Sequence, residues 1–571
     1  MAEQSDVLIV GAGVAGALIA CSLAGAGARV TVVEAGPQVD RGVALNRLER
    51  AAIRVPEAPS EIAPYAESPA TIKDTYIQQD GPDPFRSTYL RLVGGTTWHW
   101  LGTALRLLPS DLDLRSRYGV GEDWPLRYSD LAPWYDAAES ELGVSGPDDD
   151  FLGPPRQKPY PMPGLPAALG DRLIEQIAGR SGFKVRVSPQ ARNSQPFDGR
   201  PACCASSSCI PICPVQAKYD ATVHLRKAEA AGARILSESV AVRVDAGTDG
   251  RVTDILIRKP DRSETWLSAR HVIIAANAIE GPKLLLMSRS ERFQDGVANS
   301  SGAVGRYLMD HPVQLTKALS PVPVWPRRGP QEVSAIHELR DGDQRRRHGA
   351  FLMNIGNQGW EWAGPDLASL AKEYVDAGLS GLELLNAVRS HSSREMTLVA
   401  LTEQLPDPNN RITPDFDRLD AIGVPKPRVF FRLDDYTASA LAAARNMHEQ
   451  LFHAVGATEI GHIPYAEGAG HIMGTTRMGT DARTSVATAA GQSHDHPNLW
   501  FAGSSLFPTS GTANPTLIIA ALALRTAAAI KVALKQLRDD VLRDACRCGR
   551  LRFQKRPRQA LPPNPVNARS P

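Results

Sequence analysis

The chain has 571 residues, 43% hydrophobic and 22% charged, which is enough for roughly two to four domain-sized units. Its 64 Lys and Arg residues balance 62 Asp and Glu residues, for a formal net charge of +2. This balance argues against a nucleic-acid-binding protein, which gathers positive charge on one face. The hydrophobic content excludes disorder over most of the chain, and seven cysteines are too few for a disulfide scaffold of this size.

We expect neither end of the sequence to direct the chain to a membrane. The first five residues are short and polar, so we expect no secretory signal. The apolar run at 517–524 is too short to span a bilayer. Residues 543–571 are basic and rich in proline, and we expect a disordered, solvated tail there. Contact of this tail with an acidic partner or a membrane is the other interpretation.

Hydrophobic periodicity predicts an α/β chain with two domains. Buried strands are expected at 6–10, 29–33 and 271–276. Helices are expected after the first strand to Ala28 and at 131–142, 221–231 and 280–288. Hairpin strands are expected at 240–244, 252–257 and 265–267, and loops at 36–90 and 145–165. A second domain is expected from 313 to about 460, after which 498–534 returns to strand, loop and helix.

A glycine-rich turn after the first strand carries the first functional motif. Gly11, Gly13 and Gly16 allow a tight turn and let the backbone approach a pyrophosphate, which binds at the N-terminus of the following helix. Glu34 ends the second strand, where its carboxylate can accept a hydrogen bond from a ribose 2′-hydroxyl. The first strand, the following helix and Glu34 occur in the order and at the spacing of a dinucleotide-binding site. The pattern does not distinguish FAD from NAD.

A second glycine pair, Gly94 and Gly95, precedes small hydroxyl residues that include Thr97, and this pattern suggests backbone amides facing phosphate oxygens. With residues 94–100, 272–280 and 304–312 the sequence resembles the glucose–methanol–choline (GMC) flavoprotein oxidoreductases. Within that family it is most similar to the FAD/[3Fe–4S] large subunits of bacterial glucose, fructose, sorbitol or gluconate dehydrogenases.

The resemblance implies FAD as the cofactor and an α/β fold. This fold is a Rossmann-like FAD-binding domain of the GMC and p-hydroxybenzoate-hydroxylase-like type with an interleaved substrate domain on an antiparallel sheet. The expected segments are the FAD-binding domain (1–312) with an iron–sulfur loop (200–215), the substrate-binding domain (313–465), the FAD-binding domain continued (466–540) and the tail (543–571).

The resemblance also extends to residues around the flavin. His99 matches a histidine that is covalently bonded to the flavin in some members of the family. A covalent bond and simple packing against the isoalloxazine both stay open for this chain. Contacts with FAD are further implied for Gly503, Ser504, Asn514 and Thr516, together with Thr97 and the two glycine motifs.

His471 and Asn514 are the expected catalytic pair. Oxidation of an alcohol needs a base for the hydroxyl proton while the hydride leaves, and a hydrogen bond that holds the oxygen as charge develops. Imidazole suits the first task because its pKa lies near neutrality, and an amide supplies the second without titrating. By resemblance His471 is the base and Asn514 its partner, and the helix that starts near Pro515 directs its positive end at the flavin. We expect His462, His494 and His496 to be structural or exposed.

Four of the seven cysteines fall within eleven residues: Cys203, Cys204, Cys209 and Cys213. Zinc sites show paired CxxC spacing or nearby histidines, which this segment lacks, and a disulfide pair does not explain four cysteines. Closely spaced thiolates in a loop that ends in Cys-Pro are typical of iron–sulfur ligation. Similarity to the family's dehydrogenases implies a [3Fe–4S] cluster on Cys203, Cys209 and Cys213, with Cys204 left over.

These features predict an FAD-dependent dehydrogenase that oxidises a sugar or polyol hydroxyl. Electrons are expected to leave singly through the cluster to a cytochrome c or a quinone-linked acceptor. The resemblance implies a small subunit with a twin-arginine signal and a multihaem cytochrome c subunit. These partners would bring the enzyme to the bacterial periplasm and provide its membrane contact, and without them we expect it in the cytoplasm. Nucleic acid is not an expected partner.

Two other functions stay open. The chain could be a cluster-free FAD oxidase or dehydrogenase with structural cysteines, or a non-catalytic electron-transfer or assembly subunit. The residues at 313–465 show no decisive substrate pattern, and we interpret Glu403, Asn410 and Arg411 as structural. Oxidation at C1 of a sugar is the favoured specificity, and that of gluconate 2-dehydrogenase is its closest competitor.

Overall fold

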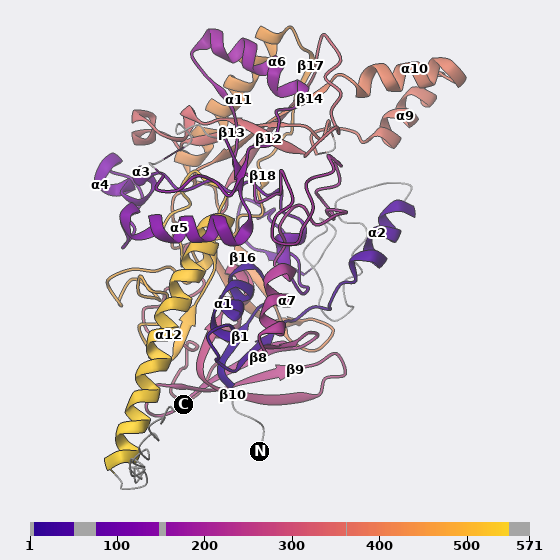
Figure 1. Ribbon diagram of the computed structural model, residues 1–571. Coiled ribbons are helices and arrows are strands. Elements are labelled where there is room, and N and C mark those ends of the chain that lie inside the picture. Colours follow the sequence, from indigo (N-terminus) through magenta and orange to yellow (C-terminus); the bar gives the residue numbers. More distant parts are fainter. Residues whose placement is uncertain (1–4, 51–75, 148–152, 154–155, 361, 548–571) are drawn as a thin grey trace, which may run out of the picture. The chain divides into compact units, whose positions relative to one another are not determined.

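The computed structural model describes residues 5–50, 76–147, 153, 156–360 and 362–547. The chain divides into two units, Met1–Ala527 and Ala528–Pro571. The first unit is built around two seven-stranded sheets. Figure 1 shows α1 and α7 beside the strands of the first sheet, and α6 and α11 beside those of the second.

The first sheet contains the strand that opens the chain and has the order β7-β2-β1-β10-β9-β8, with β19 beside β10. Its strands are β1 (Ser5–Val10), β2 (Val30–Val33), β7 (Arg234–Leu236), β8 (Val240–Ala246), β9 (Val252–Arg258), β10 (Glu264–Ile274) and β19 (Leu499–Phe501). The strands β7, β2, β1, β10 and β19 are parallel. Burial of β2 and of the last four residues of β1 explains their continuous apolar sequences.

β10 is one strand where the sequence analysis expected two. Its first half, 264–268, pairs with β9 in antiparallel fashion, and its second half, 269–274, pairs with β1 in parallel. Polar residues in the middle of the strand suggested a break, but the backbone stays extended through them. β10 therefore joins a solvent-facing hairpin to the buried centre of the sheet.

The helices that cover the first sheet are α1 (Val14–Ala24), α7 (Thr222–Ala230) and α8 (Asn277–Met287). α1 ends four residues before the expected Ala28, because Gly25 and Gly27 follow and glycine is costly in a helix. α5 (Tyr128–Leu142) agrees with its prediction. α2 (Arg41–Arg50) lies in the segment expected to be loop, so that part of the prediction is wrong.

The second sheet is antiparallel and has the order β17-β11-β14-β13-β12-β6, with β18 beside β11. Its strands are β6 (Val185–Val187), β11 (Pro312–Leu319), β12 (Glu332–Ile336), β13 (Phe351–Gly356), β14 (Glu395–Thr402), β17 (Thr458–His462) and β18 (Glu467–Gly468). α6 (Leu169–Ala178) and α11 (Asp435–Val455) pack on one face, in a core that includes Met353, Leu398 and Phe452. The sheet thus also uses α6 and β6, which precede the range expected for this domain.

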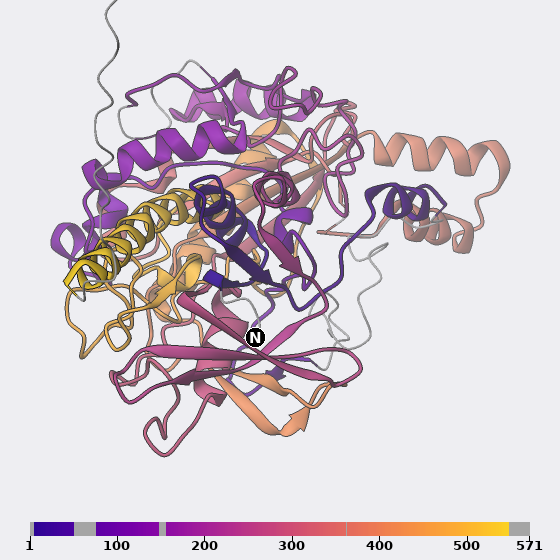
Figure 2. The same cartoon turned by 60° about the horizontal axis from the view of Figure 1, so that its bottom comes forward.

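The remaining elements are shorter. The other strands are β3 (Gln78–Gln79), β15 (Arg411–Leu419) and β16 (Pro425–Phe430), which form a third sheet, and the pair β4 (Ser145–Gly146) and β5 (Met162–Pro163). The other helices of the first unit are α3 (Pro109–Leu112), α4 (Leu114–Tyr118), α9 (Leu367–Asp376) and α10 (Gly381–Ser392). Figure 2 shows α9 and α10 projecting side by side from the rest of this unit.

α12 (Thr516–Arg547) begins in the first unit and continues into the second. It includes the first five residues of the expected tail, 543–547, and the rest of that tail lies outside the described residues. Residues 528–547 are rich in Ala, Leu, Lys and Arg, which favour helix, and this explains the difference. Thr516–Gln536 is long and apolar enough to cross a membrane, but half of it is buried, and core helices share these properties.

Candidate active site and cysteine pocket

The first glycine motif forms a tight turn between β1 and α1. Gly11 has φ +107°, and a Cβ atom there would lie 2.5 Å from the carbonyl oxygen of Ala275. The carboxylate of Glu34 is buried, and it accepts hydrogen bonds from the N–H groups of Ala12 and Gly36, both at 2.9 Å. Burial raises the pKa of Glu34. A carboxylate has further lone pairs, so Glu34 can also accept from a ribose hydroxyl.

The second glycine pair packs against the first motif. The N–H of Gly94 donates to the carbonyl of Ala12 at 3.1 Å, and a Cβ on Gly95 would lie 3.1 Å from Cα of Gly13. A Cβ atom on Gly13 would have no neighbouring atom within 4 Å. The two motifs that were expected to hold one dinucleotide therefore meet, and the open space at Gly13 fits the approach of a pyrophosphate.

Thr97 and His99 follow the second glycine pair. The Thr97 hydroxyl donates to the carbonyl of Gly94 and accepts the N–H of Ala221 at 2.9 Å, so this side chain holds the loop together. Nε2 of His99 is buried and has no hydrogen-bond partner among the described residues. Burial, with the nearby charge of Lys218, lowers the pKa of His99 to about 3. A neutral imidazole with an unused nitrogen fits either form of contact with a flavin.

His471 and Asn514 lie on two loops that a third residue connects. Nδ1 of His471 lies 2.9 Å from Nδ1 of His311, which directly precedes β11. Nε2 of His311 lies 3.1 Å from the carbonyl oxygen of Gly511, three residues before Asn514. The two imidazole rings are perpendicular, at 90°, with centroids 5.1 Å apart. His311 therefore bonds to the expected base and to the loop of the expected amide.

The hydrogen-bond partners determine the tautomers of both histidines. A carbonyl oxygen only accepts, so Nε2 of His311 is protonated and donates to Gly511. Burial lowers the pKa of His311 to about 4, so near neutral pH its Nδ1 is an acceptor. His471 must then donate from Nδ1, which leaves a free lone pair on Nε2. Burial and the proximity of His311 also lower the pKa of His471 well below its ordinary value, so the ring is neutral.

Asp310 fixes the backbone of both histidines. Its Oδ1 accepts the N–H of His311 at 2.8 Å and the N–H of His471 at 2.9 Å. Its Oδ2 accepts from the hydroxyl of Ser87, which in turn accepts the N–H of Gly470 at 2.8 Å. Burial raises the pKa of Asp310 to about 6. The position of His471 thus depends on a carboxylate 161 residues earlier in the chain.

Asn514 has an unused amide atom next to the start of α12. Its Oδ1 is buried and has no partner among the described residues. A buried polar atom without a partner is costly, which points to a ligand that completes the bond. α12 begins at Thr516, and its N-terminal N–H groups favour negative charge nearby.

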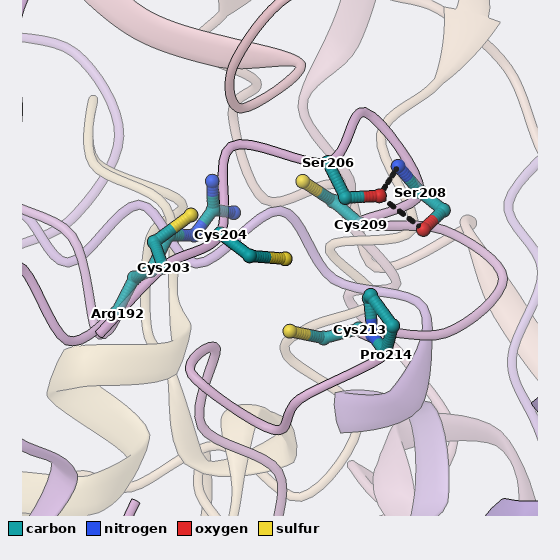
Figure 3. Close-up of a pocket in the computed structure, with 8 residues that line it drawn as sticks. All are labelled: Arg192, Cys203, Cys204, Ser206, Ser208, Cys209, Cys213 and Pro214. Atoms are coloured by element: carbon teal, nitrogen blue, oxygen red, sulfur yellow. Dashed lines mark hydrogen bonds between the residues drawn. The ribbon is translucent and has the colours of Figure 1, made fainter. Parts of the chain in front are cut away.

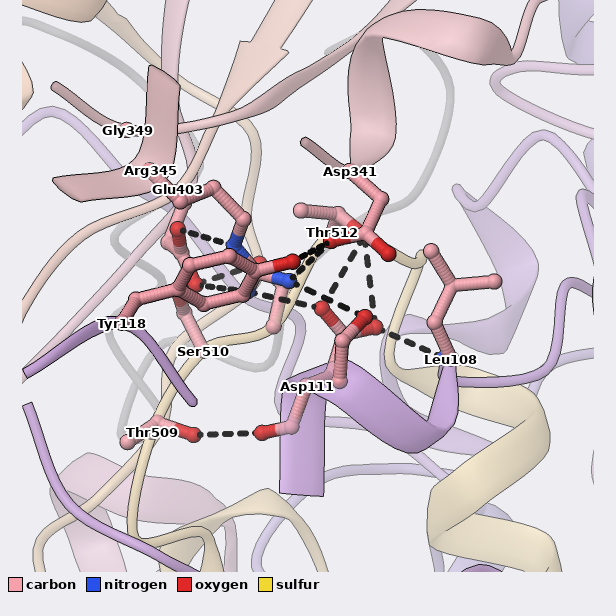
Figure 4. A network of polar contacts seen from close by, with 12 residues as sticks. Leu108, Asp111, Tyr118, Asp341, Arg345, Gly349, Glu403, Thr509, Ser510 and Thr512 are labelled. Carbon is pink, nitrogen blue, oxygen red and sulfur yellow. Dashed lines mark hydrogen bonds and ion pairs between the residues drawn. The ribbon is translucent and has the colours of Figure 1, made fainter. Parts of the chain in front are cut away.

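A buried ionic network supports the loop that leads to Asn514 (Figure 4). Arg345 forms ion pairs with Asp111, at 2.9 Å, and with Glu403, and all three side chains are fully buried. The hydroxyl of Thr512 lies 3.3 Å from both carboxylate oxygens of Asp111. Glu403 therefore has the structural role expected of it.

Gln404 connects this loop to the histidine pair. Its N–H donates to the hydroxyl of Ser510 at 3.0 Å, and the same hydroxyl lies 3.1 Å from its carbonyl oxygen. Its side-chain Oε1 accepts the N–H of Asp310 at 2.9 Å. One residue at the end of β14 thus positions both loops of the candidate active site.

Gly503 and Ser504 follow β19 and contact the segment that carries His471. The hydroxyl of Ser504 donates to the carbonyl of Ile472 at 2.5 Å, and its carbonyl accepts the N–H of Gly474 at 3.1 Å. The structure thus brings the segments of His471, Ser504 and Asn514 together.

The four clustered cysteines line one pocket, together with Arg192, Ser206, Ser208 and Pro214 (Figure 3). All four are free thiols. The pocket is small and partly open to solvent. Cys209 is buried, Cys203 and Cys213 are half-buried, and Cys204 is exposed. Burial raises the pKa of the Cys203 thiol.

The pocket gathers sulfur donors, but they do not form a site for a single metal ion. Within the part of the chain that the structure describes, no three His, Cys, Asp or Glu side chains are close enough to bind one ion. Nη1 of Arg192 is buried in the pocket wall and has no partner among the described residues. The N–H of Lys218 donates to Sγ of Cys213 at 3.5 Å. Soft sulfur donors with N–H groups aimed at them are the donor set of an iron–sulfur cluster.

The histidines that the sequence analysis excluded from catalysis make structural hydrogen bonds, with Thr316 and Glu449 (His462), Ser485 (His494), and Ala298 and Gly250 (His496). Sequence reasoning missed His311 and Asp310 as parts of the site. Both were noticed only within the 304–312 stretch that carries the family resemblance. A contact across 160 residues leaves no spacing signal in one sequence.

Comparison with protein families gives three matches. Two family models described as GMC oxidoreductase match residues 172–313 and 406–523. A third, described as FAD dependent oxidoreductase, matches residues 6–96. The matches include both glycine motifs, His471 and Asn514.

Individual proteins resemble the chain over almost its whole length. The fructose dehydrogenase large subunit of Gluconobacter japonicus is 37% identical over 93% of this chain and 99% of its own. The 2-methyl-1,2-propanediol dehydrogenase of Mycolicibacterium austroafricanum is 29% identical over 92% of this chain and 94% of its own. The crystal structure of pyridoxine 4-oxidase from Mesorbium loti has a TM-score of 0.60 at 18% identity, covering 92% of this chain and 98% of its own, and this likeness concerns the fold.

Proposed function

The chain belongs to the GMC oxidoreductase family, and on this premise we propose that it is a dehydrogenase that oxidises a sugar or polyol hydroxyl and exports the electrons through a [3Fe–4S] cluster. Family membership makes it an FAD-dependent oxidoreductase acting on alcohol or sugar donors. The proposed cluster is supported by the cysteine pocket described above, and the proposed donor and electron acceptor are supported by the resemblance to named dehydrogenases.

The oxidation uses the nitrogen that His311 leaves free on His471. Nε2 of His471 takes the proton of the substrate hydroxyl, while the C–H bond of the same carbon breaks and its hydride leaves. Bound FAD supplies the acceptor of that hydride. The amide of Asn514 hydrogen-bonds the substrate oxygen, because a flip of this amide places an N–H donor where the unpartnered Oδ1 lies. Electrons then leave the protein one at a time.

The observation that carries the proposed electron exit is the pocket of four free thiols beside a buried, unpartnered guanidinium nitrogen. Thiolates that hold iron carry negative charge, which Arg192 is positioned to balance. Cys204 at the exposed edge of the pocket gives the site a solvent side, where an acceptor protein can approach. An oxidase that passes electrons to O₂ needs no such group.

The acceptor and the partners follow from the same proposal. A similar protein is named as the large subunit of fructose dehydrogenase, which supports an assembly with other subunits. We include a small subunit with a twin-arginine signal and a cytochrome c subunit, which together place the enzyme at the periplasmic face of the membrane. Copurification of these subunits with the chain, and its loss from the membrane fraction without them, tests this part.

A hexose is the first substrate to test. The sequence favoured C1 of a sugar, whereas the named relatives include a fructose dehydrogenase at 37% identity and a gluconate 2-dehydrogenase at 24%. Dye-linked activity with fructose, glucose, sorbitol, gluconate and simple alcohols decides among them. Activity limited to simple alcohols would contradict the sugar specificity and leave the family chemistry intact.

Iron analysis tests the cluster. We expect about three iron and four sulfide ions per chain and a brown rather than yellow protein. Cys209→Ser and Cys213→Ser should lose iron and dye-linked turnover while FAD stays bound. Cys203→Ser and Cys204→Ser form a matched pair, and we expect iron loss only in the first. Yellow, iron-free protein that reduces O₂ would replace this proposal with a cluster-free oxidase.

Two further measurements test the flavin site. His471→Ala should abolish turnover with FAD retained, and unchanged turnover would indicate a non-catalytic subunit. Acid precipitation distinguishes the two states of His99, because a covalent flavin stays fluorescent in the pellet and a non-covalent one is released.

A further inference from the structure

A buried lysine connects the segment around His99 to the cysteine loop. The ammonium group of Lys218 donates to the carbonyl of Trp98 at 2.8 Å and to that of Trp100 at 2.6 Å. The backbone N–H of Lys218 donates to Sγ of Cys213 at 3.5 Å. The side chain is 1% exposed. One residue therefore touches both the loop expected to face the flavin and a cysteine of the pocket.

Arg192 makes a second, parallel connection. Its Nη2 donates to the carbonyl of Leu101 at 2.6 Å, and its guanidinium lines the cysteine pocket (Figure 3). Arg192 and Lys218 form an isolated β-bridge, and both lie near the Cβ position of Gly102, at 3.6 Å. The two cations are thus held side by side between the same two loops.

Further hydrogen bonds fix the distance between these loops. Nε1 of Trp100 donates to the carbonyl of Tyr219 at 2.7 Å, and the N–H of Ala221 donates to the hydroxyl of Thr97 at 2.9 Å. The segment that carries Lys218 is therefore fastened on both sides to the segment that carries His99. A charge in this position cannot swing away to solvent.

In the part of the chain that the structure describes, no carboxylate hydrogen-bonds to either cation, although the buried carboxylates of Glu332 and Asp220 lie close enough to interact electrostatically with Arg192 and Lys218, respectively. Among the described residues, the side-chain hydrogen bonds of Lys218 reach only carbonyl oxygens, and Arg192 uses one nitrogen on a carbonyl and leaves Nη1 unused. Fully buried charges are costly unless an opposite charge lies close. Cys209 and Cys213 also lie close enough to interact electrostatically with Lys218, and as iron-binding thiolates they would add further negative charge beside it.

We propose that Lys218, assisted by Arg192, is a positioning residue that raises the reduction potential of the iron–sulfur cluster and so directs electrons from the flavin side toward the cysteines. The inference rests on the proposed function, since it requires the cluster. Each electron that reaches the cysteine-bound iron adds one negative charge there. The fixed ammonium group stabilises that charge and thereby favours the reduced state.

Redox titration of the full, FAD-loaded chain, followed by the electron paramagnetic resonance of the cluster, tests the proposal. Lys218→Met keeps the backbone N–H that donates to Cys213 but loses the positive charge. The equilibrium between oxidised and reduced cluster should therefore shift about tenfold toward the oxidised state, which lowers the reduction potential by about 59 mV. Lys218→Arg should keep the wild-type potential. The control is Lys317→Met, at a lysine of β11 in the second sheet whose Nζ lies 4.4 Å from the centroid of the Trp360 ring. This variant should keep the wild-type potential.

The outcomes separate this inference from the function on which it rests. Wild-type protein without iron would overturn both. Iron-loaded Lys218→Met with an unchanged potential would overturn the role of Lys218 and leave the dehydrogenase proposal standing. If neutral substitutions at 218 and 192 release the iron while Lys218→Arg and Arg192→Lys retain it, a requirement for the charge is supported. Iron loss in all four variants would show a steric role and refute the proposal.

Discussion

The two ring nitrogens of His311 have different partners, and this difference determines the protonation of His471. Gly511 requires a proton on one nitrogen of His311, so the other nitrogen must accept from His471. The hydrogen bond from His311 to Gly511, in the loop of Asn514, thus determines which ring nitrogen of His471 carries the proton. The base needs no neighbouring carboxylate on its ring for its orientation.

Replacing His311 by leucine should therefore lower kcat much more than it changes KM. General-base catalysis contributes about 10²–10⁴-fold, and we expect a loss of at least about 10²-fold because His471 loses its Nδ1 acceptor. Steady-state kinetics with the flavin content measured in parallel checks this. His462→Gln, at a histidine bonded to Thr316 and Glu449, serves as the control and should keep its kcat. An unchanged kcat in His311→Leu would contradict the tautomer argument.

The pH dependence of the enzyme should reflect the buried histidine pair. Only neutral His471 accepts a proton, and burial lowers its pKa well below the ordinary 6.5. Activity should therefore be high at neutral pH, fall as Asp310, whose pKa burial raises to about 6, becomes protonated, and fall further as the pH drops through the lowered pKa of His471. A kcat/KM profile between pH 4 and 8 measures this. An acid limb centred at or above 6.5 would show that the pair is solvated in the working enzyme.

The residues of the site differ in how far the sequence could predict them. His471, Asn514 and the glycines stand in motifs, and motifs can be read from one chain. His311, Gln404 and Lys218 act through contacts with residues far away in the sequence, and each of these residue types is common. Thr97 was expected to contribute to the phosphate-facing segment through its backbone, and its hydroxyl forms hydrogen bonds within the protein that one sequence does not reveal.

In the turn between β1 and α1, one glycine is needed for folding and another leaves space for the cofactor. At Gly11 an added Cβ would lie 2.5 Å from a carbonyl oxygen, whereas at Gly13 it meets nothing within 4 Å. Gly11→Ala should therefore reduce soluble, folded protein. Gly13→Ala should fold normally but bind FAD more weakly, because the new methyl group occupies the space of the pyrophosphate. Circular dichroism and FAD titration distinguish the two, with Gly179→Ala as a neutral control. Equal FAD affinity in Gly13→Ala would place the cofactor elsewhere.

The buried network behind the 509–512 loop should contribute strongly to stability. Arg345→Met removes the cation that forms ion pairs with both buried carboxylates, and removing one partner of a buried pair costs about 3–5 kcal/mol of unfolding free energy. Turnover should fall as well, because Thr512 shares Asp111 with Arg345. Urea unfolding with an activity assay measures both effects. Arg483→Ala breaks an exposed ion pair with Asp481 and should change neither, and a similar loss in both variants would contradict the network's role.

Element boundaries were predictable where apolar periodicity is strong, as in β1, β2 and α5. β10 was read as two strands because polar residues interrupt its apolar pattern at the point where it leaves the hairpin and enters the buried sheet. α2 was missed because it is a mostly polar helix in a segment of Pro, Gly and Ser. α12 was read as ending in a tail because the basic composition of 543–571 hid five residues of helix.

For the whole molecule, the main feature is that the segments proposed to bind FAD come from distant parts of the chain. The glycine motifs and Glu34 come from the first hundred residues, and the segment from Gly503 to Thr516 comes from the end. The sequence predicted this interleaving through the family resemblance. It did not predict that α6 and β6 would join the second sheet, because strand pairing across 150 residues depends on packing that one sequence does not display.

FAD should therefore stabilise the whole first unit. A ligand that binds only the folded state at 100 times its Kd adds about 2.7 kcal/mol. Thermal unfolding of the His99→Ala protein with and without FAD tests this. Without His99 the flavin cannot be covalently bound through this residue, so FAD can be removed and added back. We expect one cooperative transition that moves upward with FAD. Two separate transitions, of which only one shifts, would show that the distant segments fold independently.

The position of β19 has a consequence for biosynthesis. β19 pairs with β10 in the centre of the first sheet, yet it is translated more than 200 residues after β10. At roughly 5–20 residues per second the ribosome needs roughly 10 to 45 s for that interval. During this time the nascent chain exposes the unpaired edge of a central strand, a site for aggregation. The parallel part of the first sheet therefore cannot be completed until β19, the last strand in the described part of the chain, has been synthesised.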